Sequence, residues 1–237
     1  QHFLMLLGRD RERIRGLSET AREEMTEYYT MWVHQIKTPI AAMRLLLQKP
    51  GQEQDPELSE QLFRIEEYVN MVLQYLRVDG DNDLIVQWND LDLMVRQAVH
   101  RYAGMFIRKK LSLSYEPLNR KVLTDEKWLV FVVEQILSNA VKYTGQGGIS
   151  IYLEPGPDTV LAIRDTGTGI ALEDQPRIFE KGFTGYNGHA DKRSTGIGLY
   201  LCRRILNRLS HEITVESEPG KGTIMRIWFA KERLEVE

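Results

Sequence analysis

Two groups of residues in this sequence could carry out chemistry, and they lie far apart along the chain. The first is His34, which opens the segment His34–Pro39 and offers an imidazole as a nucleophile. The second begins at Asn139, near the end of an apolar run, and continues through three glycine-containing turns: Asp165–Gly169, Gly196–Leu199 and Gly220–Thr223. A single glycine turn is weak evidence, but these four elements in this order predict a nucleotide site. Together with one histidine, they suggest phosphoryl transfer to that histidine.

The side chains around Asn139 have the types that a magnesium nucleotide needs. Asn139 supplies a neutral oxygen suited to Mg²⁺. Lys142 can reach a phosphate as a point charge, and Tyr143 offers a ring to the adenine. Asp165 follows an apolar strand, where a carboxylate can accept a hydrogen bond from the adenine amino group. Taken alone, the Asn139 run is explained equally well as a polar helix end, and a strand followed by a turn is the alternative for Asp165.

The glycine turns contribute backbone groups. Gly167 and Gly169 would let the backbone approach a base closely. Gly196 and Gly198 precede a helix that continues with Leu199, and the amides at a helix N-terminus can hold phosphate oxygens. The third turn, Gly220–Thr223, is explained equally well as a β-hairpin.

His34 is expected on the solvent side of a helix. It lies two residues before Ile36, which belongs to an apolar stripe, and this spacing places it roughly 200° around the helix. An unperturbed imidazole has a pKa of about 6.5 and is mostly neutral at physiological pH, so a ring lone pair is available. Thr38 shares the face of His34, and Pro39 should bend the helix. A surface histidine beside a proline kink is the alternative for this segment alone.

Two domains are expected to position these groups. Residues 9–49 and 56–78 have the period of two amphipathic helices, separated by a Pro-Gly turn. Two antiparallel helices cannot cover both apolar stripes, so we expect a homodimer in which two hairpins form a four-helix bundle. The polar residues 79–83 predict a boundary between a hairpin domain, 1–80, and a second domain, 81–237.

The second domain alternates helical and strand patterns, which predicts an α+β fold overall and an α/β sandwich with helices on one face of a mixed sheet. Helices are expected at 91–106, 126–143 and 198–209, and strands at 111–115, 148–154, 159–164, 212–217 and 222–229. Residues 170–195 form a long polar segment without clear period, as in lids.

Composition narrows the functional class. The 31 Lys and Arg balance 34 Asp and Glu to a net charge of -3, which argues against nucleic-acid binding. The single cysteine, Cys202, excludes an internal disulfide and has the setting of a small buried apolar residue.

The start of the chain has its own pattern. No apolar run is long enough to span a membrane, but residues 2–7 are apolar and arginines follow. This patch is either the inner end of a membrane helix or a helix end that packs on a partner. Because no methionine precedes Gln1, we expect a fragment, the cytoplasmic portion of a membrane protein.

The whole arrangement resembles the sensor histidine kinases of two-component systems, over nearly the entire chain. His34–Pro39 is similar to the histidine box, the Asn139 helix to the asparagine box, the three turns to the glycine boxes and Phe179–Phe183 to the phenylalanine box. The resemblance implies a dimerisation and phosphotransfer hairpin followed by a Bergerat-type ATP-binding domain, with ATP and Mg²⁺. It also implies autophosphorylation of His34, transfer to an aspartate of a response regulator, and a role for Thr38 in positioning water for phosphatase activity.

The segment Trp32–Met43 further resembles a Firmicutes subgroup that often works beside ABC transporters detecting cell-wall-active peptides.

Two positions depart from the family pattern. The family usually has an acid after the histidine, but Gln35 cannot accept a proton and can only orient the imidazole. The asparagine box usually begins with a second asparagine, and here Gln135, a longer amide, would have to reach Mg²⁺.

Two other functions stay open at this point. An ATPase clamp of the same superfamily would lack the histidine hairpin, so His34 distinguishes it. A catalytically weak scaffold that binds nucleotide and mainly dephosphorylates its partner would be compatible with Gln35 and Gln135.

Overall fold

The computed structural model describes residues 33, 36–38, 40–45, 56–78, 84–185 and 195–230. The chain divides into two units, Gln1–Asp81 and Asn82–Glu237, each with its own internal contacts. His34, Gln35 and the linker 79–83 lie outside the described residues. Over the ranges just given, no helix has the length and apolar character needed to cross a membrane.

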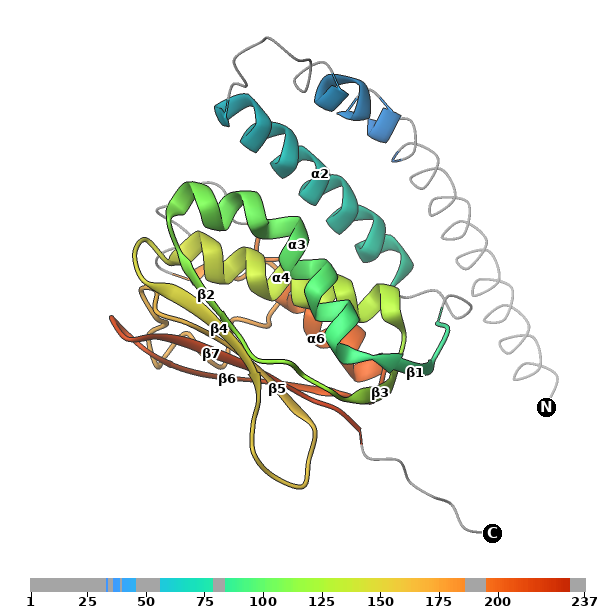
Figure 1. Cartoon of the computed structure of the whole chain (residues 1–237), viewed down its shortest axis with the longest axis vertical. Helices are drawn as coiled ribbons and strands as arrows, with labels where there is room; N and C mark the ends of the chain where they lie inside the picture. The colour runs from blue at the N-terminus through green and yellow to red at the C-terminus, as the bar shows by residue number, and fades with distance from the viewer. Residues whose placement is uncertain are drawn as a thin grey trace, which may run out of the picture. The chain divides into compact units, whose positions relative to one another are not determined.

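The first unit contains two helical segments that share an apolar core. Helix α2 spans Pro56–Arg77, as its period predicted, and residues 36–38 and 40–45 are also helical (Figure 1). An ion pair between Arg44 and Glu66 joins the two segments. The core consists of Val33, Ile40, Leu62, Val69 and Leu73, with Ile36 packed against it.

A second apolar stripe on α2 is left uncovered in the single chain. Leu58, Ile65 and Val72 recur at every seventh position and are 49%, 43% and 40% exposed. Leu62 and Val69, which continue the same helical period, are buried. One partner helix covers only part of so wide a face, so packing divides it into a covered and an uncovered half.

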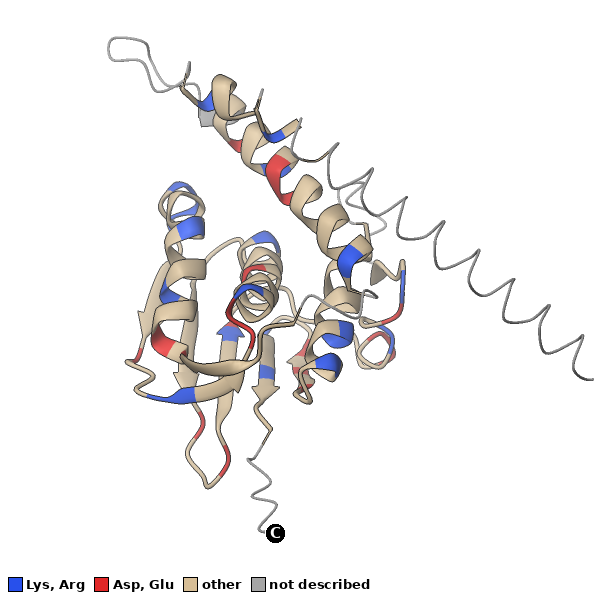
Figure 2. Cartoon of the chain, turned by 90° about the vertical axis from the view of Figure 1, so that its right-hand side faces the viewer, with Lys and Arg blue, Asp and Glu red and all other residues tan. Residues whose placement is uncertain are grey.

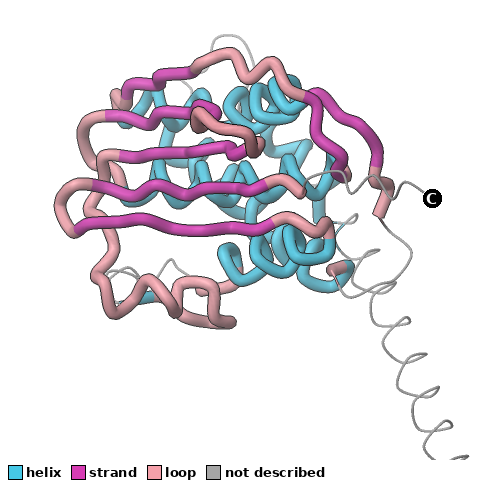
Figure 3. The backbone as a smooth tube through the Cα atoms, turned by 90° about the horizontal axis from the view of Figure 1, so that it is seen from below, coloured by secondary structure: helices cyan, strands magenta, loops and turns pink. Residues whose placement is uncertain are grey.

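The second unit is built in two layers. Its elements are β1 Gln87–Asp90, α3 Leu91–Lys109, β2 Ser112–Tyr115, β3 Lys121–Thr124, α4 Glu126–Tyr143, β4 Gly148–Leu153, β5 Val160–Asp165, α6 Gly198–Arg208, β6 Glu212–Glu218 and β7 Gly222–Trp228. Five strands form a mixed sheet in the order β2-β4-β5-β7-β6, in which β2 and β4 are parallel and the other pairs antiparallel. Helices α3, α4 and α6 lie on one face of this sheet (Figure 3).

This α+β architecture was predicted from the sequence, with one omission. Helix α4 has the predicted bounds, and α3 continues past its predicted end at Phe106 to Lys109. Strands β1 and β3 were not predicted and pair with each other in a separate antiparallel sheet. Each has four residues, too few for an alternating pattern to stand out.

Side chains fix the start of both long helices. Asp90 accepts hydrogen bonds from two amides in the first turn of α3, at 2.9 and 3.3 Å. Asp125 accepts one from the amide of Trp128 at 3.1 Å at the start of α4. Such N-caps contribute about 1 kcal/mol each relative to alanine. They set the register in which α3 and α4 present their side chains.

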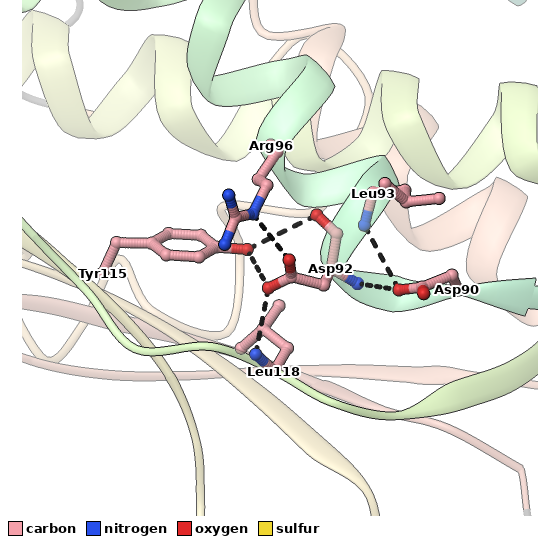
Figure 4. A network of polar contacts seen from close by, with 6 residues as sticks. All are labelled: Asp90, Asp92, Leu93, Arg96, Tyr115 and Leu118. Carbon is pink, nitrogen blue, oxygen red and sulfur yellow. Dashed lines mark hydrogen bonds and ion pairs between the residues drawn. The ribbon is translucent and has the colours of Figure 1, made fainter.

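Asp92 then ties the start of α3 to the end of β2 (Figure 4). Its Oδ1 accepts from Tyr115 Oη at 2.7 Å and from the amide of Leu118 at 3.0 Å, and its Oδ2 accepts from Arg96 Nε at 2.6 Å. Burial opposes the charged form, but these hydrogen bonds outweigh it and lower the pKa of Asp92. Burial and the bond to Asp92 both raise the pKa of Tyr115. The two groups therefore stay a charged acceptor and a neutral donor.

A buried histidine links the far end of the sheet to β3. His211 is 4% exposed, and its Nδ1 accepts from the amide of Ala230 at 3.2 Å. The ring proton therefore lies on Nε2, which donates to Thr124 Oγ1 at 3.0 Å. Burial lowers the pKa of His211 to about 4, so the ring is neutral at physiological pH and takes no part in charge-dependent binding.

Helix α4 is the central and most buried helix. Ten of its 18 residues are buried: Trp128, Leu129, Val130, Phe131, Val132, Val133, Ile136, Leu137, Ala140 and Val141. It packs against both α3 and α6 and contacts β5. Its half-buried polar side chains, among them Gln135, Asn139 and Lys142, lie in the C-terminal half of the helix.

Candidate nucleotide site

The predicted nucleotide residues come from three segments: the last turn of α4, the Asp165 loop that contacts this turn, and the start of α6, which lies beside Gln135 about two turns further back on α4. The side chains of Asn139, Lys142 and Tyr143 are all half-buried. Lys142 Nζ lies 5.2 Å from the centroid of the Tyr143 ring, which is within the range of a cation–π contact. The turn thus presents an amide, a cation and an aromatic ring together.

Asp165 ends β5 and begins the loop that lies beside this turn. The residue is 7% exposed, and its Oδ1 accepts from the amide of Gly167 at 2.8 Å. Burial raises the pKa of Asp165, against the opposing effect of the amides of Gly167 and Thr223. The loop is joined to α4 through the amide of Thr168, which donates to the carbonyl of Tyr143 at 3.2 Å.

Two glycines of this loop are required by close packing within the protein. A Cβ atom on Gly167 would lie 2.7 Å from the carbonyl oxygen of Tyr143. Gly169 has a φ of +69°, and a Cβ there would lie 2.1 Å from the carbonyl oxygen of Glu218. Other residues would be strained at both positions. The sequence analysis explained both glycines by a close approach of the backbone to a nucleotide base. Packing against Tyr143 and Glu218 is a second reason why glycine is needed at these positions.

The turn Gly220–Thr223 holds the same loop from the other side. It connects β6 and β7 in a β-hairpin, which was one of the two explanations given for this turn from the sequence. The amide of Gly220 donates to the carbonyl of Thr168 at 2.8 Å. A Cβ on Gly222 would lie 2.0 Å from the carbonyl oxygen of Asp165. This turn therefore positions Asp165 through the backbone.

Sequence reasoning missed the polar residues that fix the chain after Gly169. Ser217 Oγ accepts from the amide of Ile170 at 2.8 Å. Gln175 Nε2 donates to the carbonyls of Ser217 and Ile170 at 2.7 and 3.1 Å. Each bond pairs a side chain with a backbone group, so no spacing of residue types marks it in the sequence.

The third segment is the start of α6. No side chain in the described part of the chain caps this start, so its first amides are suited to an anion. A Cβ on Gly198 would lie 2.7 Å from Gln135 Oε1, which brings the amide of Gln135 on α4 to the start of α6. Gly196, with a φ of +66°, and the half-buried Leu199 flank this point. Helix α6 also carries Arg203, Arg204 and Arg208; Figure 2 colours the ribbon blue at the Lys and Arg positions of the described chain.

The donor set fits a metal held largely by a nucleotide. Within the described ranges no three His, Cys, Asp or Glu residues are grouped to bind a metal ion. Gln135 and Asn139, four residues apart on α4, share a face and offer neutral oxygens. Mg²⁺ commonly combines few protein ligands with phosphate oxygens and waters. Among the described residues, the buried Thr144 Oγ1 beside the Asp165 loop has no hydrogen-bond partner, as expected where a bound group or water completes a site.

The predicted phosphotransfer residues are only partly described. Thr38 is helical and exposed, while Val33 and Ile40 on either side are buried. His34 and Gln35 lie outside the described residues, so their predicted exposure stays a prediction.

Comparison with known proteins first defines the class. Residues 124–233 match the family of histidine kinase-, DNA gyrase B- and HSP90-like ATPases. The crystal structure of full-length ShkA in complex with AMPPNP aligns with a TM-score of 0.61 at 22% identity, over 86% of this chain and 46% of that one. At this identity the likeness concerns the fold, which is that of an ATPase domain preceded by helices.

Relatives in sequence define the family. The chain is 35% identical to sensor protein BceS of Bacillus subtilis (strain 168) over 212 residues, which cover 88% of this chain and 64% of the relative. It is 31% identical to sensor histidine kinase YxdK of the same strain over 220 residues, covering 90% and 67%. The chain belongs to the sensor histidine kinase family, as its sequence motifs predicted. It spans 64% and 67% of the lengths of these two relatives.

We predict that Mg-ATP binding weakens in acid because of Asp165. Only the charged carboxylate can accept freely from an amino group, and burial makes the carboxylate protonate above its ordinary pKa of 3.8. Asp165→Asn should weaken binding by about tenfold or more, in line with the loss of a charged hydrogen bond. It should also flatten the pH dependence. Calorimetric titration with Mg-ATP at a series of acidic pH values measures both effects.

The matched control is Glu212→Gln, which removes an exposed carboxylate from the outer face of β6. Titration of the nucleotide itself contributes equally to every variant, so only the difference from the unmodified chain counts. The same pH dependence in Asp165→Asn and the unmodified chain would contradict the assignment.

Proposed function

We propose that this chain is the catalytic core of a homodimeric sensor histidine kinase that transfers the γ-phosphoryl group of ATP to His34. The phosphoryl group would then pass to an aspartate of a cognate response regulator. The observation that carries the proposal is that the Asp165 loop contacts the last turn of α4 while the start of α6 lies beside Gln135 on the same helix, in a chain that also holds the histidine segment His34–Pro39. Residues 1–80 would serve phosphotransfer and dimerisation, and residues 81–237 would bind ATP.

The nucleotide would lie against the last turn of α4. Asp165 would accept from the adenine amino group, Tyr143 would contact the base and Lys142 a phosphate. Backbone groups would come from Gly167, Gly169, Gly196, Gly198 and Leu199. The uncapped start of α6 and the AMPPNP complex of ShkA, which shares the fold, support this assignment.

Mg²⁺ would be held by Asn139 and by Gln135, together with phosphate oxygens. The ion would neutralise charge that develops on the transferred group. Gln135 faces the start of α6, which supports a place for its amide near the phosphates.

In the transfer step, a lone pair on the His34 ring would attack the γ-phosphorus. The N–P bond forms as the bond from that phosphorus to the bridging oxygen breaks, and ADP leaves with the electron pair. Gln35 would orient the ring by hydrogen bonding, because an amide cannot accept the imidazole proton.

Dimerisation would cover the exposed stripe of α2. Leu58, Ile65 and Val72 are uncovered in the single chain and repeat every seven residues, the spacing of helix bundles. Pairing with a second copy would bury them in a four-helix bundle.

The cellular setting is proposed from the resemblance of Trp32–Met43 to the Firmicutes subgroup and from the share of the relatives that the chain covers. The chain covers 64% of BceS, which leaves room for a sensing region in a longer protein. We propose that the chain is the cytoplasmic portion of a membrane-bound sensor of cell-wall-active peptides. An ABC transporter would be a further partner.

We predict that His34→Gln abolishes covalent labelling by γ-labelled ATP and leaves Mg-ATP affinity within about twofold. Every proposed nucleotide contact lies on the other unit, so the histidine is needed for chemistry only. Labelled protein should lose its label in acid and keep it in base, as phosphohistidine does.

The control for this test is His100→Gln, an exposed histidine on α3 that should keep full labelling. ATP hydrolysis without labelling of the unmodified chain would favour an ATPase clamp. If the unmodified chain binds nucleotide but neither hydrolyses ATP nor becomes labelled, the result would favour a dephosphorylating scaffold.

We predict that Asn139→Ala reduces magnesium-dependent labelling of His34 far more than Gln135→Ala does. Asn139 matches the metal position of the family, whereas Gln135 already departs from it. Initial rates at saturating Mg-ATP decide between them, and similar residual rates in the two variants would reject this ranking.

We predict that Thr38→Ala keeps autophosphorylation but prolongs the lifetime of phosphate on the regulator. The exposed hydroxyl of Thr38 would align the hydrolytic water without activating His34. The lifetime is measured with each kinase variant added to phosphorylated regulator, and equal lifetimes would rule out this role.

A further inference from the structure

The last carbonyl groups of α4 are capped without a left-handed glycine. A helix leaves its last four carbonyls without partners inside the helix. In α4 the amide of Thr144 takes the carbonyl of Ala140, so the four remaining carbonyls belong to Val141, Lys142, Tyr143 and Thr144. Many helices satisfy such groups with a left-handed glycine, but Thr144 has φ -97° and ψ 114°, which is extended backbone.

A side chain from another helix provides the missing donors. Lys109, the last residue of α3, places its Nζ 2.5 Å from the carbonyl oxygen of Val141, 3.1 Å from that of Lys142 and 3.2 Å from that of Thr144. An ammonium has three protons to donate, which matches these three acceptors. The fourth carbonyl, of Tyr143, accepts from Thr168 in the Asp165 loop. All four carbonyls therefore have partners.

This closure lies where two parts of the nucleotide site join. Lys142 and Tyr143, whose side chains would contact the nucleotide, have their carbonyls held by Lys109 and Thr168 respectively. The charge of Lys109 also offsets the negative end of the α4 dipole, beside a site that would receive an anion. Without Lys109, these three carbonyls would lose a charged donor, and the turn would be held less firmly.

We propose that Lys109 is a positioning residue of the nucleotide site. Its ammonium holds the last turn of α4 so that Tyr143, Lys142 and the Asp165 loop keep the arrangement that binds ATP. Lys109 itself does not touch the nucleotide. The inference rests on the proposed ATP site and names a residue on α3 that lies outside every motif of the sequence.

The test compares Lys109→Met with Lys110→Met. Methionine removes the charge and the donors but keeps the length of the side chain. Lys110 is the adjacent exposed lysine, so its variant controls for loss of one charge. Lys109→Met should weaken Mg-ATP binding by about tenfold, as expected for lost charged hydrogen bonds. Lys110→Met should stay within about twofold, and Lys109→Arg, which keeps charge and donors, should recover most of the affinity.

Two further readouts separate positioning from a general loss of stability. In labelling of His34, Lys109→Met should raise KM while kcat at saturating ATP changes little, because bound nucleotide restores the turn. Hydrogen exchange at the amide of Thr168 should be faster in Lys109→Met than in Lys110→Met. If Lys109→Met does not fold, Lys109→Gln and Lys110→Gln are compared in the same way.

Equal Mg-ATP affinity in folded Lys109→Met and Lys110→Met would overturn the proposal, and so would unchanged exchange at Thr168. If the unmodified chain binds no Mg-ATP, the proposed function fails. The exchange comparison then still decides whether Lys109 holds the loop.

Discussion

A helix that is buried along its length must still satisfy the carbonyls at its end, and this constraint organises the second unit. Helix α4 packs against α3, α6 and the sheet, so its end meets protein on several sides. Lys109 of α3 and Thr168 of the Asp165 loop supply the donors there. Because those donors come from different elements, closing α4 also brings the polar groups of the candidate site together. The β6–β7 hairpin also packs against the Asp165 loop. Gly222 lies so close to the carbonyl oxygen of Asp165 that no residue with a Cβ atom would fit there.

Most of the fold could be predicted because its signals are local. Helix α4 is a long, strongly apolar run, so both of its bounds were predicted correctly. Strands β1 and β3 were missed because each has four residues and makes sense only as a pair. The helical period of α2 predicted an apolar face. It did not predict which residues of that face would be buried and which exposed, because this depends on the helix that packs against α2.

The parts of the candidate site that consist of characteristic side chains could be predicted from the sequence. The parts that depend on contacts with backbone groups could not. Asn139, Lys142, Tyr143 and Asp165 stand out by type and order, and the structure brings them to one turn and the adjacent loop. Lys109, Ser217 and Gln175 were missed because each bonds to carbonyls or amides that every residue has. Lys109 also comes from a helix end rich in basic residues, where one more lysine has no distinguishing pattern.

Helix α3 is fastened at both ends. At its start, Asp92 binds the end of β2, and at its finish Lys109 binds the end of α4. Its 19 residues make a rod of about 28 Å, and its last side chain reaches the turn of α4 that carries Lys142 and Tyr143. Strand β1 leads directly into α3, so one continuous stretch of chain connects the small β1–β3 sheet to the turn that carries Tyr143.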